Sequence, residues 1–269
     1  MAPVAPADPV AAVSPGPAAA LAFTGVTKAY GAHTVLAGIS LELRPGSRLG
    51  LIGPAAAGKS VICKLACGLE APDRGDVHVL GESLAGRSEA SLGPLRQRIG
   101  FLFQNYALFD YLTVEQNVAF PLQQRARLDG PAIAARVAER LRSVGLAGSE
   151  AKLTAELSGG MKKRVGIARA TVADPELVIY DEPTAGLDPV TTQKIYDLLA
   201  ADQARTGASV LAVSSDVIAL AAFVDEIAFL YRGRIVYRGP ATTIADAPDP
   251  MVRQFVRGEL TGPLAEGGA

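Results

Sequence analysis

The stretch Ser47–Leu69, SRLGLIGPAAAGKSVICKLACGL, restricts the possible folds more than any other part of the chain. An apolar run ends at Gly53, a short loop closes at Gly58, and apolar residues at helical spacing continue as far as Gly68. A loop between a buried strand and a helix gathers backbone N–H groups at the helix N-terminus, where phosphate oxygens bind. The stretch therefore predicts a parallel strand, a phosphate-binding loop and a helix.

Strands and helices alternate along most of the remaining sequence. Strands are expected at 21–30, 34–43, within 75–84, and at 98–104, 177–182, 209–214, 226–231 and 234–239. Helices are expected at 113–122, 131–144, from 158 onward, at 189–204 and after 216. This order predicts an α/β fold with a mainly parallel sheet, flanking helices, an antiparallel β part and a helical part near 105–160.

Composition excludes several classes of protein. The 269 residues are 49% hydrophobic, enough for a real core, and 26 basic against 27 acidic residues leave no overall positive field for nucleic acid. Residues 1–20 are rich in Ala and Pro and contain no Lys or Arg, so we expect a disordered lead-in rather than a secretory signal. The apolar region 208–224 is too short and too polar to span a bilayer, and no transmembrane helix is expected.

The two cysteines, Cys63 and Cys67, lie four residues apart on one predicted helix. A redox pair or half of a metal site is one interpretation, but the neighbouring sequence supplies no further cluster of ligands. We expect both to be small buried side chains, in a reducing compartment.

The loop GPAAAGKS fits the pattern G-x-x-x-x-G-K-S/T in the required position between strand and helix. The residues expected to contact ATP here are Gly53, Pro54, Ala55, Ala56, Ala57, Gly58, Lys59, Ser60 and Val61. Lys59 would add positive charge at the outer phosphates, and the Ser60 hydroxyl would bind Mg²⁺. A glycine-bounded turn that merely precedes a lysine is the alternative.

The stretch LVIYDE supports the nucleotide interpretation because an apolar strand ends there in Asp181 and Glu182. A metal-bound triphosphate needs carboxylates beside its loop. Asp181 would hold Mg²⁺ through water, and Glu182 would polarise the attacking water. Two acids exposed at a strand end are the alternative, but together the two motifs predict a P-loop NTPase.

The segment LSGGMKKR decides the kind of NTPase. Ser158 can cap a helix whose first turn contains Gly159 and Gly160, so an anion can approach the free N–H groups closely. A plain cap would need no double glycine. The segment resembles the signature of the ATP-binding cassette (ABC) family, which contacts the ATP of the opposite subunit.

The resemblance extends from Leu21 to about Val256 and implies roles for further residues. Tyr30 matches the aromatic residue that stacks on adenine, Gln104 the glutamine that touches Mg²⁺ and senses the permease, and Asp188 the loop that crosses the dimer interface. The alternatives are a strand-end aromatic, a solvent-facing strand end and a helix cap. The resemblance implies an ABC domain at 21–258 with a C-terminal tail at 259–269, working as a dimer that sandwiches ATP.

The chain contains one cassette and has no room for long coiled coils between its motifs, so a transport subunit with a separate membrane permease is expected. Phe109 and Tyr111 fall where the family docks its permease. LFQNYALFDYLTVEQNVAFPL, Met161 and the tail QFVRGELTGPL look like ATPase subunits of MCE-type lipid transporters. That resemblance implies phospholipid cargo, an MCE-domain lipid-binding protein, sometimes a STAS-domain subunit, and a peripheral cytoplasmic location at the inner membrane. A small-solute importer is the alternative.

Two positions depart from the family pattern. Ser215 stands where the family carries a histidine that reaches the outer phosphate, and a serine cannot become a cation. Loss of one charge-assisted hydrogen bond in the transition state would slow hydrolysis by about 10 to 100-fold. We expect a slow ATPase, with a regulatory ATP binder as the alternative. Ala56 replaces a glycine, which costs roughly 1 to 2 kcal/mol if its φ is positive.

Overall fold

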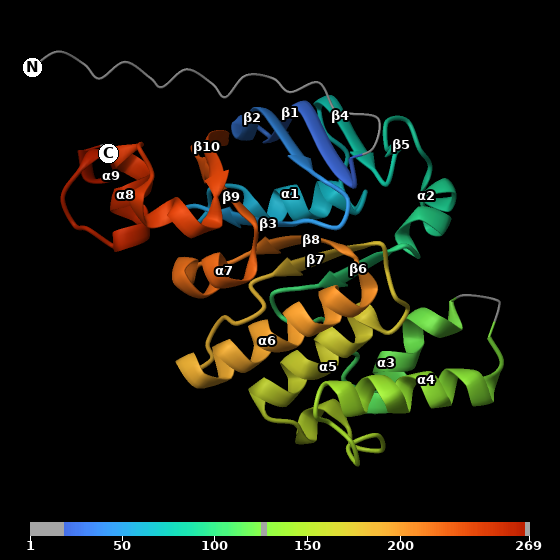
Figure 1. Cartoon of the computed structure of the whole chain (residues 1–269). Helices are drawn as coiled ribbons and strands as arrows, with labels where there is room; N and C mark the ends of the chain where they lie inside the picture. Colours follow the sequence, from blue (N-terminus) through green and yellow to red (C-terminus); the bar gives the residue numbers. More distant parts are fainter. Residues whose placement is uncertain (1–18, 125–127, 267–269) are drawn as a thin grey trace, which may run out of the picture. The chain divides into compact units, whose positions relative to one another are not determined.

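The computed structural model describes residues 19–124 and 128–266 (Figure 1). Most of the predicted lead-in, 1–18, lies outside this description. Ala19 and Ala20 are already buried, and the Ala20 N–H donates to the Leu43 carbonyl at 2.9 Å. Ala19 and Ala20, which precede the predicted boundary at Leu21, are therefore part of the packed structure.

The chain divides into two compact units. The first comprises the residues up to Gly86 and from Leu220 onward, and the second comprises Arg87–Ala219. The division falls inside α7 (Val217–Phe223). The elements of the first unit are β1 (Leu21–Tyr30), β2 (His33–Leu43), β3 (Arg48–Ile52), α1 (Lys59–Ala66), β4 (Arg74–Val79), β5 (Glu82–Ser83), β9 (Glu226–Tyr231), β10 (Arg234–Pro240), η2 (Ala241–Asp246), α8 (Pro250–Arg257) and α9 (Pro263–Glu266).

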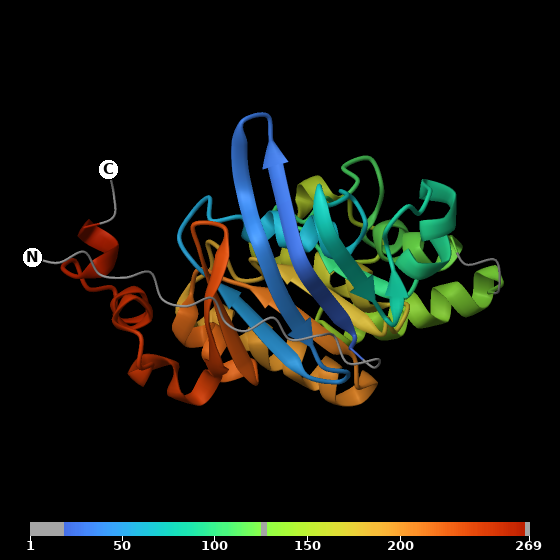
Figure 2. The same ribbon diagram turned by 90° about the horizontal axis from the view of Figure 1, so that it is seen from above.

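The N-terminal strands of the first unit form the expected antiparallel sheet. Strand β1 pairs with β2 in a register that joins Leu21 to Leu43 and Tyr30 to His33. On its other edge β1 pairs with β4, which continues to β5. Figure 2 shows β1 and β2 as a long hairpin, and the register brings Tyr30 to its turn.

The strand before the phosphate loop is buried and parallel, as predicted. Leu49, Leu51 and Ile52 of β3 are at most 1% exposed, and β3 pairs in parallel with β9, which pairs antiparallel with β10. Cys63 in α1 and Cys67, the residue that ends the helix, are both buried, which confirms their interpretation as small buried side chains.

The C-terminal residues pack beyond the predicted domain end at 258. The ring of Phe255 in α8 lies 5.0 Å from that of Phe229. The Gln254 side chain donates to the Glu259 carbonyl at 3.2 Å and accepts from the Leu264 N–H at 2.7 Å. The first residues of the predicted tail are therefore part of the fold.

The second unit contains three parallel strands and most of the helices. Its elements are α2 (Glu89–Arg96), β6 (Ile99–Leu102), α3 (Val114–Gln123), α4 (Gly130–Ser143), η1 (Thr154–Glu156), α5 (Gly159–Thr171), β7 (Leu177–Asp181), α6 (Pro189–Thr206) and β8 (Ser209–Val213). Strand β7 lies between β6 and β8 and is parallel to both. The carboxyl ends of the three strands therefore meet at one edge. Helix α2, capped by Ser88, was absent from the predicted elements.

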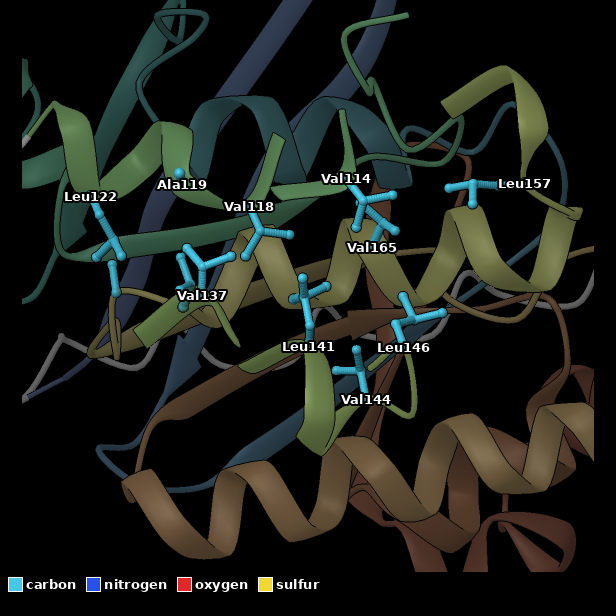
Figure 3. Close-up of a cluster of buried hydrophobic side chains, with 13 residues drawn as sticks. Val114, Val118, Ala119, Leu122, Val137, Leu141, Val144, Leu146, Leu157 and Val165 are labelled. Atoms are coloured by element: carbon cyan, nitrogen blue, oxygen red, sulfur yellow. The ribbon is translucent and has the colours of Figure 1, made fainter. Parts of the chain in front are cut away.

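Helices α3, α4 and α5 share a core of their own. Figure 3 shows Val118, Val137 and Leu141 gathered between α3 and α4, with Val165 of α5 nearby. These four side chains are at most 1% exposed. Burial of each aliphatic side chain contributes about 1.5 to 3 kcal/mol, which holds the three helices together. Helix α5, which carries the signature segment, is thereby fixed to the helical part of the unit.

Among the residues that the structure describes, no helix combines the length and apolar character needed to cross a membrane.

Candidate active site

The phosphate loop begins and ends with glycines whose backbone conformation and close packing disfavour any side chain. Gly53 has φ 152° and Gly58 has φ 105°. A Cβ at Gly53 would lie 2.1 Å from the Leu230 carbonyl oxygen, and one at Gly58 would lie 2.8 Å from Leu36 Cδ2. Tight packing against β9 and β2 therefore fixes the path of the loop.

Ala56 has φ 59°, so an alanine adopts the left-handed conformation that favours glycine. The steric cost predicted for Ala56 required a positive φ, and the structure has one. Its methyl group carries a cost of about 1 to 2 kcal/mol. Ala55 and Ala56 are exposed, so their methyl groups displace no core residue.

The donors at the start of α1 fit a phosphate ligand. The first helical hydrogen bond is the one from the Ile62 N–H to the Gly58 carbonyl at 3.1 Å. The N–H groups of Lys59, Ser60 and Val61 precede it and point out of the helix N-terminus. The Lys59 ammonium donates to the carbonyls of Gly53 at 2.8 Å and Pro54 at 2.9 Å, which places its charge over the loop. The Ser60 hydroxyl is exposed beside them, a ligand type that suits Mg²⁺.

Tyr30 is held in place at the end of β1 while its ring stays accessible. Its hydroxyl donates to the Glu70 carboxylate, which also accepts from Lys64 Nζ at 3.1 Å. Burial, together with the hydrogen bond and charge of Glu70, raises the pKa of Tyr30 to about 12. The side chain is 45% exposed, so a planar ligand can reach the ring. Glu70 is a residue that sequence reasoning missed.

Two carboxylates lie at the carboxyl end of β7 in the second unit, as predicted. Asp181 is the buried last residue of the strand. The Glu182 N–H donates to the Val213 carbonyl of β8 at 2.9 Å, and Glu182 has φ 54°. A left-handed glutamate is a strained conformation of the kind found at functional sites. Its backbone is thus fixed between two strands.

Ser215 lies directly against the Glu182 carboxylate. Both its N–H and its hydroxyl donate to Glu182 Oε2, each at 3.1 Å. Gln104 is exposed just beyond β6. Gln104, Glu182 and Ser215 therefore follow three neighbouring strands whose carboxyl ends share one edge.

The signature segment begins α5 with a cap and two open glycines. The Ser158 hydroxyl accepts from the Met161 N–H at 3.3 Å. A Cβ at Gly159 or Gly160 would meet nothing within 4 Å, so these positions leave the backbone open to a ligand. The cap is therefore combined with an approachable helix N-terminus.

Asp188 caps α6, the alternative considered from the sequence. Its carboxylate accepts from the Thr191 N–H at 2.9 Å and the Thr191 hydroxyl at 2.6 Å. These bonds, the hydroxyl first, lower the pKa of Asp188. A capping role leaves the side chain exposed and does not compete with an interface role.

The predicted site residues fall into two groups. Tyr30 and the phosphate loop belong to the first unit, whereas Gln104, the two carboxylates, Ser215, the signature segment and Asp188 belong to the second. Sequence reasoning missed two buried cations on α5. Lys163 and Arg169 bind backbone carbonyls, Lys163 that of Ala185 and Arg169 those of Tyr106 and Ala107. A basic residue inside a helical run gives no signal of burial by itself.

The second unit also contains an apolar groove of about 590 Å³, with walls contributed by α2, β6, α3 and α5. Phe109 lines it, and its ring lies 4.9 Å from that of Phe120 and 5.9 Å from the Arg169 guanidinium. Tyr111 is 79% exposed and is not among the lining residues; the permease-docking role of both aromatics stays a prediction.

Phosphate-binding backbone in one unit and paired carboxylates in the other are the parts of a P-loop nucleotide hydrolase. Residues 36–185 match the family model described as ABC transporter, so the chain belongs to the ABC transporter family. It is an ABC cassette, an ATPase that uses ATP with Mg²⁺ to power transport. Such cassettes act as dimers with membrane permease partners. The expected fold class and cofactors are confirmed.

Several proteins resemble the chain over most of its length. It is 41% identical to the chloroplastic protein TRIGALACTOSYLDIACYLGLYCEROL 3 of Arabidopsis thaliana, covering 89% of this chain and 74% of the relative. It is 39% identical to the methionine import ATP-binding protein MetN of Caulobacter vibrioides, covering 92% and 76%. A solved dimeric ATP-binding cassette bound to ADP and Pi in a post-hydrolysis state superposes with a TM-score of 0.77 at 29% identity, covering 82% of this chain and 98% of that one.

Proposed function

We propose that Glu182 is the general base of ATP hydrolysis in this chain. The observation that carries the proposal is the position of its carboxylate, fixed after β7 and held by the N–H and hydroxyl of Ser215 at 3.1 Å each. A carboxylate oxygen held in this way can take the proton of a water molecule aimed at the outer phosphate. Gln104, which follows the neighbouring strand, would orient the same water.

The remaining roles follow the donor types at each position. Backbone N–H groups from Ala55 to Val61 and the Lys59 ammonium would hold the phosphates, and Tyr30 would stack on adenine. Ser60, Gln104 and Asp181 would hold Mg²⁺, whose chemical contribution is to neutralise phosphate charge. Ser158, Gly159, Gly160 and Asp188 would act on the ATP of a second cassette across the dimer.

Ser215 should make the cycle slow. Its hydroxyl donates to Glu182 but carries no positive charge, so it stabilises the charge that develops on the outer phosphate less than an imidazolium does. With Ser215→His we expect turnover of the assembled transporter to rise by about 10 to 100-fold. The measurement is phosphate release at saturating MgATP.

Ser215→Ala is the matched control, because it removes the hydroxyl without adding a cation, and it should not raise turnover. The slow-cycle proposal is contradicted if the wild type already hydrolyses ATP as fast as histidine-bearing relatives and Ser215→His does not change that rate.

For the cargo we propose phospholipid or another hydrophobic molecule, moved between bacterial membranes. One relative bears the name of a galactolipid, which supports a lipid substrate. The partners would then be a permease, an MCE-domain lipid-binding protein and a STAS-domain subunit, with this chain on the cytoplasmic face of the inner membrane. The apolar groove beside Phe109 supports a docked permease helix.

A second candidate is a small-solute importer, because another relative is named a methionine import protein. The two are separated by co-purifying the chain with its permease and reconstituting the complex in vesicles. ATP-dependent transfer of fluorescent phospholipid between vesicles, without methionine uptake, is the expected result. Methionine uptake without lipid transfer contradicts the lipid proposal and favours the importer.

A further inference from the structure

Lys163 is a buried lysine on the signature helix α5, and its side chain reaches the segment that follows β7. The side chain is 1% exposed. Its ammonium donates to the Ala185 carbonyl and lies 5.8 Å from the centroid of the Tyr106 ring. Lysine is rarely this buried because taking an ammonium out of water costs free energy that few contacts restore.

The segment that Lys163 contacts, Glu182–Asp188, connects two site residues. Glu182 begins it and Asp188 ends it as the cap of α6. Between them, the Ala185 N–H donates to the Glu182 carbonyl at 3.4 Å and the Leu187 N–H to the Thr184 carbonyl at 3.1 Å. These turns make the path from Glu182 to Ala185 short. A contact from α5 at Ala185 therefore restrains the backbone that carries the Glu182 carboxylate.

We propose that Lys163 is a positioning residue for ATP hydrolysis, which links the signature helix to Glu182 by holding the segment Glu182–Asp188 through Ala185. The inference rests on the proposed role of Glu182 as general base. Lys163 would then do more than pack in the core. The helix α5, whose N-terminus presents Ser158, Gly159 and Gly160, would also set the position of the Glu182 carboxylate.

The charge of Lys163 adds a second contribution. The titratable groups that face it are the Glu182 carboxylate and the Tyr106 phenol. Burial lowers the pKa of Lys163 to about 8, while the negative charge of Glu182 opposes that change. The ammonium is therefore mostly charged at neutral pH and loses its proton under mildly alkaline conditions.

The same pKa gives a stability argument with a definite sign. Between about 8 in the folded chain and 10.5 in the unfolded chain, the unfolded state binds more protons, so stability rises with pH in this window. Below it, the buried charge lowers stability. Lys163→Met, which removes the charge and keeps the length, should therefore leave the melting temperature at or above that of the wild type at neutral pH.

The test measures kcat and KM for ATP in Lys163→Met, Lys163→Arg and the exposed control Lys194→Met. We expect kcat of Lys163→Met to fall by about 10 to 100-fold with KM within about twofold, because the lost charge-assisted contact positions Glu182 for hydrolysis and does not hold ATP. Lys163→Arg should recover most of the rate and should not lose activity through the alkaline range where wild-type Lys163 deprotonates. Lys194→Met should match the wild type.

Wild-type kcat in Lys163→Met overturns the proposal, as does a loss of kcat that accompanies a melting temperature lowered by more than about 5 °C. Glu182→Gln, assayed in parallel, separates this inference from the proposed function. If Glu182→Gln abolishes hydrolysis while Lys163→Met does not affect it, only the role of Lys163 fails. If Glu182→Gln hydrolyses ATP at the wild-type rate, the proposed role of Glu182 as general base is wrong, whatever Lys163→Met shows.

Discussion

Single residues of this chain combine backbone strain with functional position. Ala56 in the phosphate loop and Glu182 after β7 both have positive φ, at 59° and 54°. Such conformations persist only where the surroundings determine them. The Glu182 conformation is held by the hydrogen bond from its N–H to the Val213 carbonyl and by the hydrogen bonds that Ser215 donates to its carboxylate. For Ala56, the constraint comes from the glycines that fix both ends of the loop.

Ala56→Gly should stabilise the fold. Relief of about 1 to 2 kcal/mol of steric cost is offset by about 0.5 to 1 kcal/mol of backbone entropy, for a net gain of about 0.5 to 1 kcal/mol. Urea unfolding measures the change. Ala57→Gly is the matched control, because Ala57 lies outside the left-handed region, and it should lose stability. A destabilised Ala56→Gly would show that the loop methyl group makes favourable contacts.

The elements of the second unit are joined by a buried ion pair between α4 and α6. Arg140 Nη1 donates to Asp202 Oδ1 at 2.7 Å, and the two side chains are 7% and 5% exposed. The Arg140 guanidinium also donates to the Thr171 hydroxyl of α5. One guanidinium therefore connects three helices, and its charge has been removed from water.

Asp202→Ala should cost about 3 to 5 kcal/mol, because Arg140 keeps a buried charge without its carboxylate. Chemical denaturation monitored by circular dichroism gives the value. Glu89→Ala is the control, since Glu89 pairs with Arg96 at 2.6 Å on the surface and should change stability little. Equal effects of the two substitutions would contradict a special role of the buried pair.

The sequence predicted most elements because their signals are local. The apolar run before Gly53, the caps at Ser158 and Asp188, and the strand before Asp181 each carry their pattern within a few residues. Lys163 and Arg140 carry none, since a basic residue at a helical position looks the same whether it faces solvent or a carbonyl. A short aromatic run likewise does not say which ring turns inward: Phe109 lines the groove, whereas Tyr111 is exposed.

At the scale of the whole molecule, the chain is one half of a dimeric motor. Its phosphate loop is expected to bind ATP, and its signature segment is expected to act on the ATP of the partner cassette. The claim on which the proposals depend is narrower: Glu182 of this chain performs hydrolysis despite Ser215 and Ala56.

Phosphate release from wild type and Glu182→Gln, measured at saturating MgATP on the assembled transporter, tests this claim most directly. Removal of a general base should lower the rate by at least about 100-fold. The Kd for ATP should stay within about twofold, because the carboxylate is not expected to hold the nucleotide. Equal phosphate release from the two proteins would contradict hydrolysis by Glu182 and would leave a regulatory ATP-binding subunit as the better description.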